Sequence, residues 1–210
     1  MVKIERIKCG NGNCYIISEG KKAILVDTVR SKYRSRVLEA CKNYDIGLIV
    51  LTHGHMDHVQ NAAFLAKEWN VPIAMAKEDV ELIENNIRQP LYAHTLLGKL
   101  VLAISIDSFH HDFIETFEPD VLLKDGDTLD QYGIPAKIIA LPGHTKGSIA
   151  LEVEDQLIVG DALMNMFYPT VSMLYNNKED MLNSARKISQ MGDKKIYFGH
   201  GKPVQNKGWV

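Results

Sequence analysis

The sequence predicts an α/β protein in which two sheets pack together and helices cover them on the outside. Short apolar runs of strand length alternate with segments whose apolar residues recur at helical spacing. This alternation occurs twice, before and after an unusual stretch at about residues 85–118. Because 46% of the 210 residues are hydrophobic, the chain can bury a sizeable core, and we expect one domain spanning residues 1–210.

The individual elements follow from apolar periodicity and turn residues. A nearly continuous apolar run at residues 46–52 predicts a strand buried on both faces. Other strands are expected at residues 2–7, 13–18, 23–27, 71–75, 120–123, 136–141, 149–153, 156–159 and 195–198. Helices are expected at residues 32–43 and 58–69, from about Lys77, and at residues 178–191 with Asn177 as the cap.

Residues 85–118 form a separate apolar stretch that we interpret as a helical insertion. Leu97, Val101 and Ile104 are spaced as on one helix face. An exposed face of this kind is rare in soluble monomers, so the insertion should cover the site described below or pack against a second copy in a homodimer. The alternative is a helix that only extends the core. His94, His110 and His111 match no motif, and we expect exposed or locally bonded rings there. The alternative is that His110 or His111 lines the substrate pocket.

The segment Thr-His-Gly-His-Met-Asp-His at residues 52–58 carries the clearest chemical signal. It follows the buried strand directly, and alternate residues of an extended segment point to one side, so His53 and His55 can converge. Asp57 and His58 lie at the turn into the next helix and can face the same space. Imidazole nitrogen and carboxylate oxygen suit zinc, and also iron or manganese. The motif therefore predicts a metal site.

Three isolated residues share the position of this motif just beyond a predicted strand. His144 follows Leu-Pro-Gly, Asp161 follows Ile-Val-Gly, and His200 follows Phe-Gly. Each has a glycine immediately before it, which permits a close backbone approach. Sites in α/β folds gather at the carboxyl ends of strands, so we expect these three side chains to join the metal site.

Composition excludes several other classes. The formal charge of −2 argues against a nucleic-acid partner. The three cysteines, Cys9, Cys14 and Cys41, fit neither a disulfide framework nor a zinc pattern. No apolar run is long enough for a signal peptide or a membrane span, so we expect a cytoplasmic protein with no membrane partner.

Taken in order, the motifs THGHMDH, PGHTKGS, VGDA and FGHG, with Asp27 in LVDT, resemble the metallo-β-lactamase superfamily. The resemblance runs from Asp27 to His200 and omits the insertion. It implies a four-layer αββα sandwich. It also implies one metal held by His53, His55 and His144, a second held by Asp57, His58 and His200, and Asp161 as the bridge between them.

Two details refine the resemblance. Asp27 matches the aspartate that lies near the metal loops in this superfamily, and we interpret it as an orienting residue and not as a ligand. The glycine that usually follows the aspartate–threonine pair is Val29 here, which is a departure in the local loop geometry.

The residues also narrow the branch of the superfamily. His55 excludes the flavodiiron-like branch, and Asp161 argues against the main zinc β-lactamases. A bridging aspartate resembles glyoxalase II, lactonases, tRNA-processing nucleases and persulfide dioxygenases. The best-known lactonases carry a tyrosine where Met164 stands, although Tyr168 and Tyr175 are close in sequence. The chain ends ten residues after His200, so we expect a form without the helical domain of long glyoxalase II proteins.

The resemblance implies a hydrolase that uses a hydroxide bridging two divalent metal ions, with zinc as the first candidate and iron or manganese as alternatives. We expect a small-molecule substrate, a thioester or another activated acyl ester, with Asp57 and Asp161 as the catalytic carboxylates. Three alternatives stay open. They are a lactonase, a dioxygenase with a single iron held by His53, His144 and Asp161, and a binding protein that has lost activity.

Overall fold

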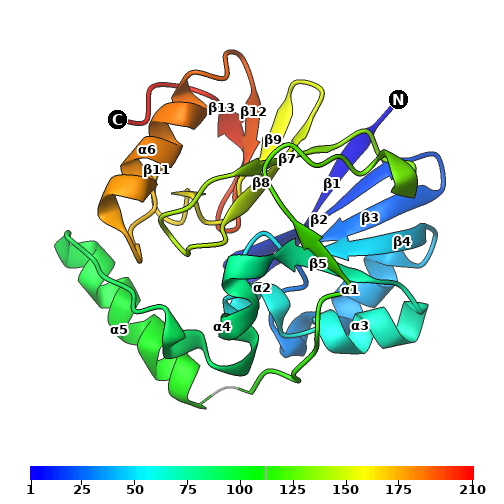
Figure 1. The fold of residues 1–210 in the computed structure, drawn as a ribbon, viewed down its shortest axis with the longest axis horizontal. Coiled ribbons are helices and arrows are strands. Elements are labelled where there is room, and N and C mark those ends of the chain that lie inside the picture. Colours follow the sequence, from blue (N-terminus) through cyan, green and yellow to red (C-terminus); the bar gives the residue numbers. More distant parts are fainter. Residues whose placement is uncertain (112) are drawn as a thin grey trace.

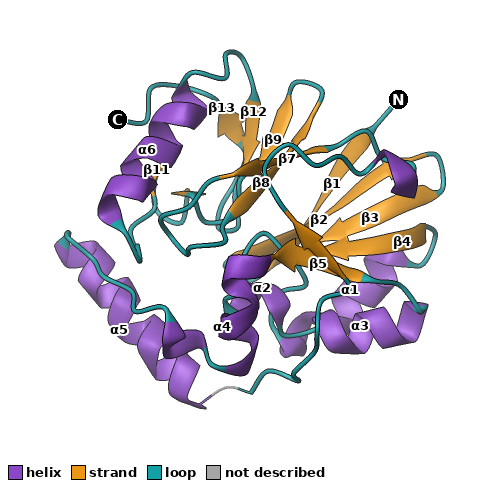
Figure 2. Cartoon of the chain, viewed as in Figure 1, coloured by secondary structure: helices purple, strands orange, loops and turns teal. Residues whose placement is uncertain are grey.

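The computed structural model describes residues 1–111 and 113–210, and only the backbone of residues 108–111. Two twisted sheets pack face to face (Figures 1 and 2). In hydrogen-bonding order, the first sheet contains β1 (Lys3–Cys9), β2 (Gly12–Glu19), β3 (Lys22–Val26), β4 (Asp45–Val50), β5 (Ile73–Ala76) and β6 (Val121–Leu123). The strands β1, β2 and β3 pair antiparallel, whereas β3, β4, β5 and β6 run parallel.

The second sheet is built from the second half of the chain. In hydrogen-bonding order it contains β13 (Val204–Gln205), β12 (Lys195–Tyr197), β9 (Gln156–Ile158), β8 (Ile149–Val153) and β7 (Lys137–Ala140). The strands β9 and β12 are its parallel pair. A separate hairpin joins β10 (Leu163–Met164) to β11 (Thr170–Val171).

Helices cover the outer face of each sheet. The helices α1 (Arg34–Cys41) and α3 (Ala62–Trp69) lie on the first sheet, and α6 (Lys178–Ser189) lies on the second (Figure 2). The order of layers is therefore αββα, as predicted. Shorter helical segments are η1 (Ser31–Tyr33), α2 (Met56–Val59), η2 (Lys77–Asp79), α4 (Val80–Glu84), η3 (Asn86–Arg88) and η4 (Asp130–Tyr132).

Alternation along the strands produces three apolar layers. On β2, Tyr15 and Ile17 face the other sheet, whereas Cys14 and Ile16 face α1 and α3. On the second sheet, Leu151 points into the layer between the sheets and Ala150 points toward α6. Each sheet thus buries both of its faces, which explains why its strands are almost continuously apolar.

The predicted helix at residues 58–69 is in fact two helices, α2 and α3. Asn61 stands between them and is fully buried. Its side-chain amide donates to the carbonyl oxygens of Thr28, Val29 and Arg30 at 2.7–3.1 Å. The break in the helix therefore ties α3 to the loop that follows β3.

The insertion is helical only in part, which corrects the expectation of a helix across residues 85–118. The helix α5 (Leu96–His111) is regular, but residues 113–119 form neither helix nor strand. Instead, Ile114 and Phe117 pack onto the apolar layer beneath α1 and α3. On the outer side of α5, Leu96, Leu100 and Ile104 are 87%, 59% and 63% exposed.

Of the three histidines that match no motif, His94, His110 and His111, the structure describes the side chain of only one. His94 is exposed, and its ring lies 5.8 Å from the ring of Tyr175. The side chains of His110 and His111 lie outside the described part of the structure. The cysteines Cys9, Cys14 and Cys41 are buried thiols, in agreement with the predicted lack of disulfides. None of the helices in the described ranges is long and apolar enough to cross a membrane.

Candidate metal centre

Parallel strands bring the predicted site residues to one edge of the sandwich. Asp27 follows β3 and His53 follows β4, and these neighbouring strands are aligned with Val26 opposite Val50. In the second sheet, Asp161 follows β9 and His200 follows β12, with Tyr197 opposite Ile158. The backbone amide of Ile149 donates to the carbonyl oxygen of Thr52 at 2.9 Å and joins the two sheets at this edge.

All seven residues predicted to bind metal converge there. Their ligand atoms form three groups in which every pair of atoms lies within 4.8 Å. The groups are His53, His55 and His144; His53, His58 and Asp161; and Asp57, His58 and His200. The first and third groups contain the same residues that the sequence assigned to the first and second metal ions.

Asp161 lies between these two groups. Its Oδ2 is 3.8 Å from Nε2 of His144 and 3.3 Å from Nε2 of His200. Its Oδ1 is 3.6 Å from Nε2 of His58. One carboxylate therefore borders histidines of both groups, which is the geometry that a bridging ligand requires.

Several ring nitrogens are held by the surrounding protein so that the other nitrogen faces the cluster. The Nδ1 atom of His58 donates to Asp27 at 2.8 Å, that of His144 to the carbonyl oxygen of Leu174 at 2.9 Å, and that of His200 to the carbonyl oxygen of Asn11 at 3.0 Å. Metal-binding histidines are characteristically oriented in this way, through the nitrogen that does not bind the metal.

Buried atoms without a protein partner mark the centre of the cluster. The Nε2 atoms of His53 and His58 and the Oδ1 atom of Asp161 are buried and have no hydrogen-bond partner among the described residues. Leaving such groups unsatisfied costs about 1–3 kcal/mol each. Divalent cations bound in the cluster would satisfy these atoms, and nitrogen and carboxylate donors suit zinc, iron and manganese. The residues present therefore fit a metal site.

Asp27 supports the cluster without entering it, as the sequence analysis predicted. Its carboxylate accepts hydrogen bonds from the amide and hydroxyl of Thr52 at 2.8–3.0 Å and from His58. It is fully buried, and its backbone is left-handed with φ of 60°. The neighbouring Val29 also has a positive φ, 53°, so a β-branched residue occupies a conformation that favours glycine.

Asp79 is a supporting residue that the sequence analysis missed. Its Oδ2 accepts from the amide of Gly54 at 2.9 Å and from the hydroxyl of Thr145 at 2.7 Å, and its Oδ1 accepts from the amide of Gly147 at 2.7 Å. Asp79 thereby connects the loop of His53 and His55 to the loop of His144. In the sequence it has the pattern of an ordinary acidic residue at the start of a helix, so no local signal identifies it.

Burial and charge divide the histidines into two classes. Burial lowers the pKa of His53, His55 and His144, so these rings are neutral near pH 7. His58 and His200 behave oppositely. Burial disfavours their charged forms, but the carboxylates of Asp27 and Asp161 raise the pKa of His58 to about 9.

The carboxylates of the cluster show the matching shifts. Against the effect of burial, Asp161 and Asp57 raise the pKa of His200 well above its ordinary value. In turn, His200 and His58 hold the pKa of Asp161 and of Asp57 below the ordinary range, although burial opposes this. Both carboxylates are therefore ionised at neutral pH, and two of the histidines carry protons that a cation must displace.

Comparison with known proteins supports a common fold and chemistry. The family model described as the metallo-beta-lactamase superfamily matches residues 7–200. Hydroxyacylglutathione hydrolase 1 of Vibrio vulnificus is 28% identical over 193 residues, which cover 91% of this chain and 63% of that protein. A "Probable metallo-hydrolase" of Methanocaldococcus jannaschii is 27% identical over 199 residues, which cover 91% of this chain and 88% of that protein.

Solved structures share the fold at lower identity. TTHA1623, solved in a di-iron-bound form, is 18% identical and has a TM-score of 0.71. The match covers 100% of this chain and 100% of that one. A metallo-beta-lactamase family protein of Thermus thermophilus is 19% identical, with a TM-score of 0.72 over 98% of this chain and 75% of that one. From the family match and the cluster of histidines and aspartates, we conclude that the chain belongs to the metallo-beta-lactamase superfamily, whose members are metallo-hydrolases.

Proposed function

We propose that the protein is a hydrolase with two divalent metal ions, zinc in the first instance, that cleaves a thioester or another activated acyl ester. The observation that carries this proposal is the position of Asp161. Its two oxygens lie 3.3–3.8 Å from histidine nitrogens of both ligand groups, so a single carboxylate can serve two cations. An enzyme with one metal ion would leave Asp57, His58 and His200 without a role.

The ligand assignment follows the groups described above. His53, His55 and His144 would hold one ion, and Asp57, His58 and His200 would hold the other, with Asp161 shared. Held by these residues, two such ions would supply a water molecule that ionises near neutral pH and would polarise the carbonyl oxygen of the substrate.

The protein residues around the cluster have their own tasks. Asp57 is the most open of the proposed ligands, since its side chain is 26% exposed, and the substrate would approach past it and His200. Burial opposes the charged form of Asp57, but the neighbouring His200 and His58 hold its pKa well below the ordinary value, so its carboxylate is ionised at neutral pH beside the path of the substrate. Asp27 and Asp79 form hydrogen bonds with the loops that carry the histidines, and thereby keep the ligand atoms at fixed positions relative to one another.

The relatives support an acyl substrate. Hydroxyacylglutathione hydrolase 1 of Vibrio vulnificus, by its name, hydrolyses an acyl derivative of a thiol, and this chain aligns with it over 91% of its own length. We infer a thioester on this basis. Iron and manganese are the alternatives for such donors, and we place zinc first because imidazole nitrogen and carboxylate oxygen are its usual ligands in hydrolytic sites.

A substrate panel tests this function. Purified protein reloaded with zinc is assayed against thioesters, lactones, phosphodiesters and persulfides, before and after chelation. We expect thioesters to be hydrolysed fastest, the chelated protein to be inactive, and zinc to restore the activity. Oxygen consumption with a persulfide by protein containing one iron per chain would instead establish the dioxygenase, and preferred lactone cleavage would establish the lactonase.

A further inference from the structure

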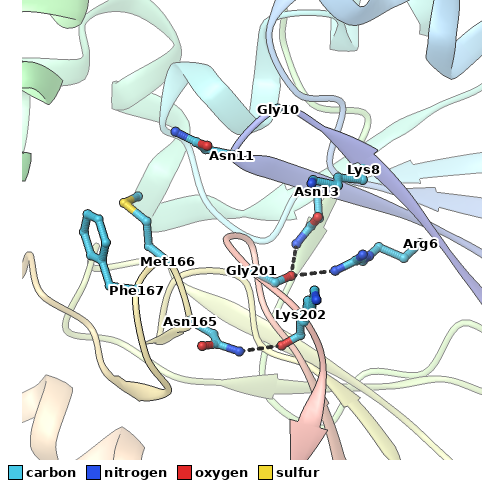
Figure 3. A pocket seen from close by; sticks show the side chains of 10 residues that line it. All are labelled: Arg6, Lys8, Gly10, Asn11, Asn13, Asn165, Met166, Phe167, Gly201 and Lys202. Atoms are coloured by element: carbon cyan, nitrogen blue, oxygen red, sulfur yellow. Dashed lines mark hydrogen bonds between the residues drawn. The ribbon is translucent and has the colours of Figure 1, made fainter.

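A pocket of about 340 Å³ lies beside the metal centre and is not used by the assignment above. It opens between the turn of the β1–β2 hairpin, the segment after β10 and the residues that follow β12 (Figure 3). The side chains that matter for its chemistry are Arg6, Lys8, Asn11, Met166, Phe167 and Lys202.

One wall of the pocket is the backbone that carries His200. The carbonyl oxygen of Asn11 accepts the hydrogen bond from Nδ1 of His200 at 3.0 Å. The amide of Asn165, another lining residue, donates to the carbonyl oxygen of His200 at 2.9 Å. Two residues that line the pocket therefore contact His200 directly, which places the pocket next to the metal centre.

The pocket is strongly positive although the whole chain has a formal charge of −2. Arg6, Lys8 and Lys202 line it, and its lining contains neither aspartate nor glutamate. Within the described part of the chain, none of these three side chains forms an ion pair with a carboxylate. Three cationic groups around one cavity without counter-charges create a potential that attracts an anion.

Two asparagine side chains of the wall form hydrogen bonds that tie together the segments around the pocket. Asn13 donates to the carbonyl oxygens of Phe198 and Gly201 at 2.8–2.9 Å, and Asn165 donates to that of Lys202 at 2.8 Å. The Nη1 atom of Arg6 donates one hydrogen bond to the carbonyl oxygen of Gly201 at 2.9 Å (Figure 3). The guanidinium has five N–H donors, so it retains donors for a ligand.

The opposite wall is apolar. Figure 3 shows Met166 and Phe167 across the cavity from Arg6 and Lys202. Phe167 is 58% exposed, which leaves its ring available to a ligand. A ligand that combines an anionic end with a short carbon chain would contact both walls.

We propose that this pocket binds a carboxylate or phosphate group on the arm of the acyl substrate that extends away from the metal centre. The inference rests on the proposed function, because the metal centre fixes the position of the reacting carbonyl. Arg6 pairs with two oxygens of the anion, while Lys8 and Lys202 contribute point charges. The preferred substrate is therefore an anionic acyl thioester and not a neutral one.

The test uses a variant that removes charge without disturbing the core. Lys8 and Lys202 are exposed, so Lys8→Gln with Lys202→Gln should fold and load metal as the wild type does. The matched control is Lys3→Gln with Lys67→Gln, which removes the same charge from exposed positions outside the pocket. Arg6→Lys, in a separate protein, keeps the charge but loses the paired donors.

Direct binding gives the first readout, independent of any reaction. The holoenzyme with 13C-methyl methionine is titrated with inorganic phosphate and with succinate, and the Met166 signal is followed. We expect saturable shifts in the wild type and in the control, and about tenfold weaker binding in the pocket variant, the size expected for charge-assisted contacts. Equal binding by all three proteins would overturn the proposal.

Kinetics give the second readout. Acetyl thioesters of one chain length are compared, in which the thiol carries a carboxylate, a phosphate or a neutral amide. The pocket variant should raise KM for the two anionic substrates by about tenfold with little change in kcat, and should leave the amide unaffected. The substrate whose KM rises more, the carboxylate or the phosphate thioester, shows which of the two anions the pocket binds. If anions bind at Met166 but no thioester is cleaved, the pocket stands and the thioesterase assignment fails. Identical KM values for anionic and neutral thioesters in the wild type would contradict the inference.

Discussion

At the scale of single residues, Asp79 determines how well the two ligand loops are aligned. Both of its oxygens accept a backbone N–H, from Gly54 and from Gly147, and the residue is fully buried. An asparagine has only one side-chain oxygen, so in either orientation its NH2 group, a donor, would face one of these two N–H donors. The carboxylate is therefore required for the loops of His53 and His144 to meet.

We predict that Asp79→Asn is nearly as damaging as Asp79→Ala. Each should lower the free energy of unfolding by about 3 kcal/mol, because buried donors lose their acceptor, and should weaken metal binding by at least about tenfold. Urea unfolding and metal titration measure the two effects. The exposed neighbour Glu78 provides the control Glu78→Gln. An Asp79→Asn protein that binds metal as tightly as this control would show that Asp79 does not position the ligands.

Asn61 has a comparable role on the other side of the cluster. Its amide holds three carbonyl oxygens of the loop in which Asp27 and Val29 have positive φ. A left-handed conformation costs an ordinary residue about 1–2 kcal/mol, so the loop needs this anchor.

Asn61→Ala should therefore destabilise the protein by about 3 kcal/mol, since it leaves buried carbonyl oxygens unpaired. The orientation of His58 should suffer as well, because Asp27 lies in the same loop. Thermal unfolding and metal content are the measurements. Asn70→Ala is not a suitable control, because the backbone of Asn70 is itself in the left-handed conformation. Lys67→Ala, on the exposed side of α3, is the appropriate control. A loss below about 0.5 kcal/mol, the range of ordinary surface changes, would refute the anchoring role.

At the scale of elements, α5 carries an apolar stripe that the described part of the protein does not cover. Leu96, Leu100 and Ile104 are spaced by four residues and are more than half exposed. Stripes of this kind occur where another molecule packs. The sequence analysis expected this face either to cover the metal site or to pack against a second copy of the chain, and we propose the second copy.

Sedimentation velocity tests this expectation. The wild type should sediment as a dimer at micromolar concentration, and Leu100→Lys with Ile104→Lys should sediment as a monomer with unchanged metal content. Lys99→Gln, on the same helix, should leave the dimer intact. A wild type that is monomeric across this range would contradict dimerisation through α5.

Elements with strong local signals were predictable from the sequence. The strand β8 lies where the apolar run at residues 149–153 indicates, and Asn177 caps α6 through the amides of Glu179 and Asp180. Short pairs such as β10 and β11 were missed, because two residues show no periodicity. Likewise, most ligands were recognisable because they come shortly after a strand, and Asp57 and His58 because they share one motif with His53 and His55. Asp79, in contrast, acts only through contacts that are distant in sequence.

At the scale of the whole molecule, the cluster couples metal uptake to pH. His58, with a pKa of about 9, and His200, with a pKa well above its ordinary value, carry protons at pH 7. Each must lose its proton before Nε2 can bind a cation. Zinc affinity should therefore rise as the pH increases from about 6 toward 9 and level off above it.

Isothermal titration with zinc at pH 7 checks this coupling. In buffers with different ionisation enthalpies, the heats should reveal the release of roughly one to two protons per chain. The number should fall at about pH 9.5, where His58 has already lost its proton. Heats that do not depend on the buffer at pH 7 would mean that these rings are neutral before the metal binds.

The central claim is that seven side chains from both sheets hold two metal ions with Asp161 shared between them. Native mass spectrometry of zinc-reloaded protein tests it most directly, with Asp161→Ala and the exposed-turn variant Asp155→Ala measured beside the wild type. We predict about two zinc ions per chain in the wild type and in Asp155→Ala, and reduced occupancy of both sites in Asp161→Ala, because each ion loses a ligand. A wild type that binds a single ion, or an Asp161→Ala protein with both sites filled, would contradict the claim.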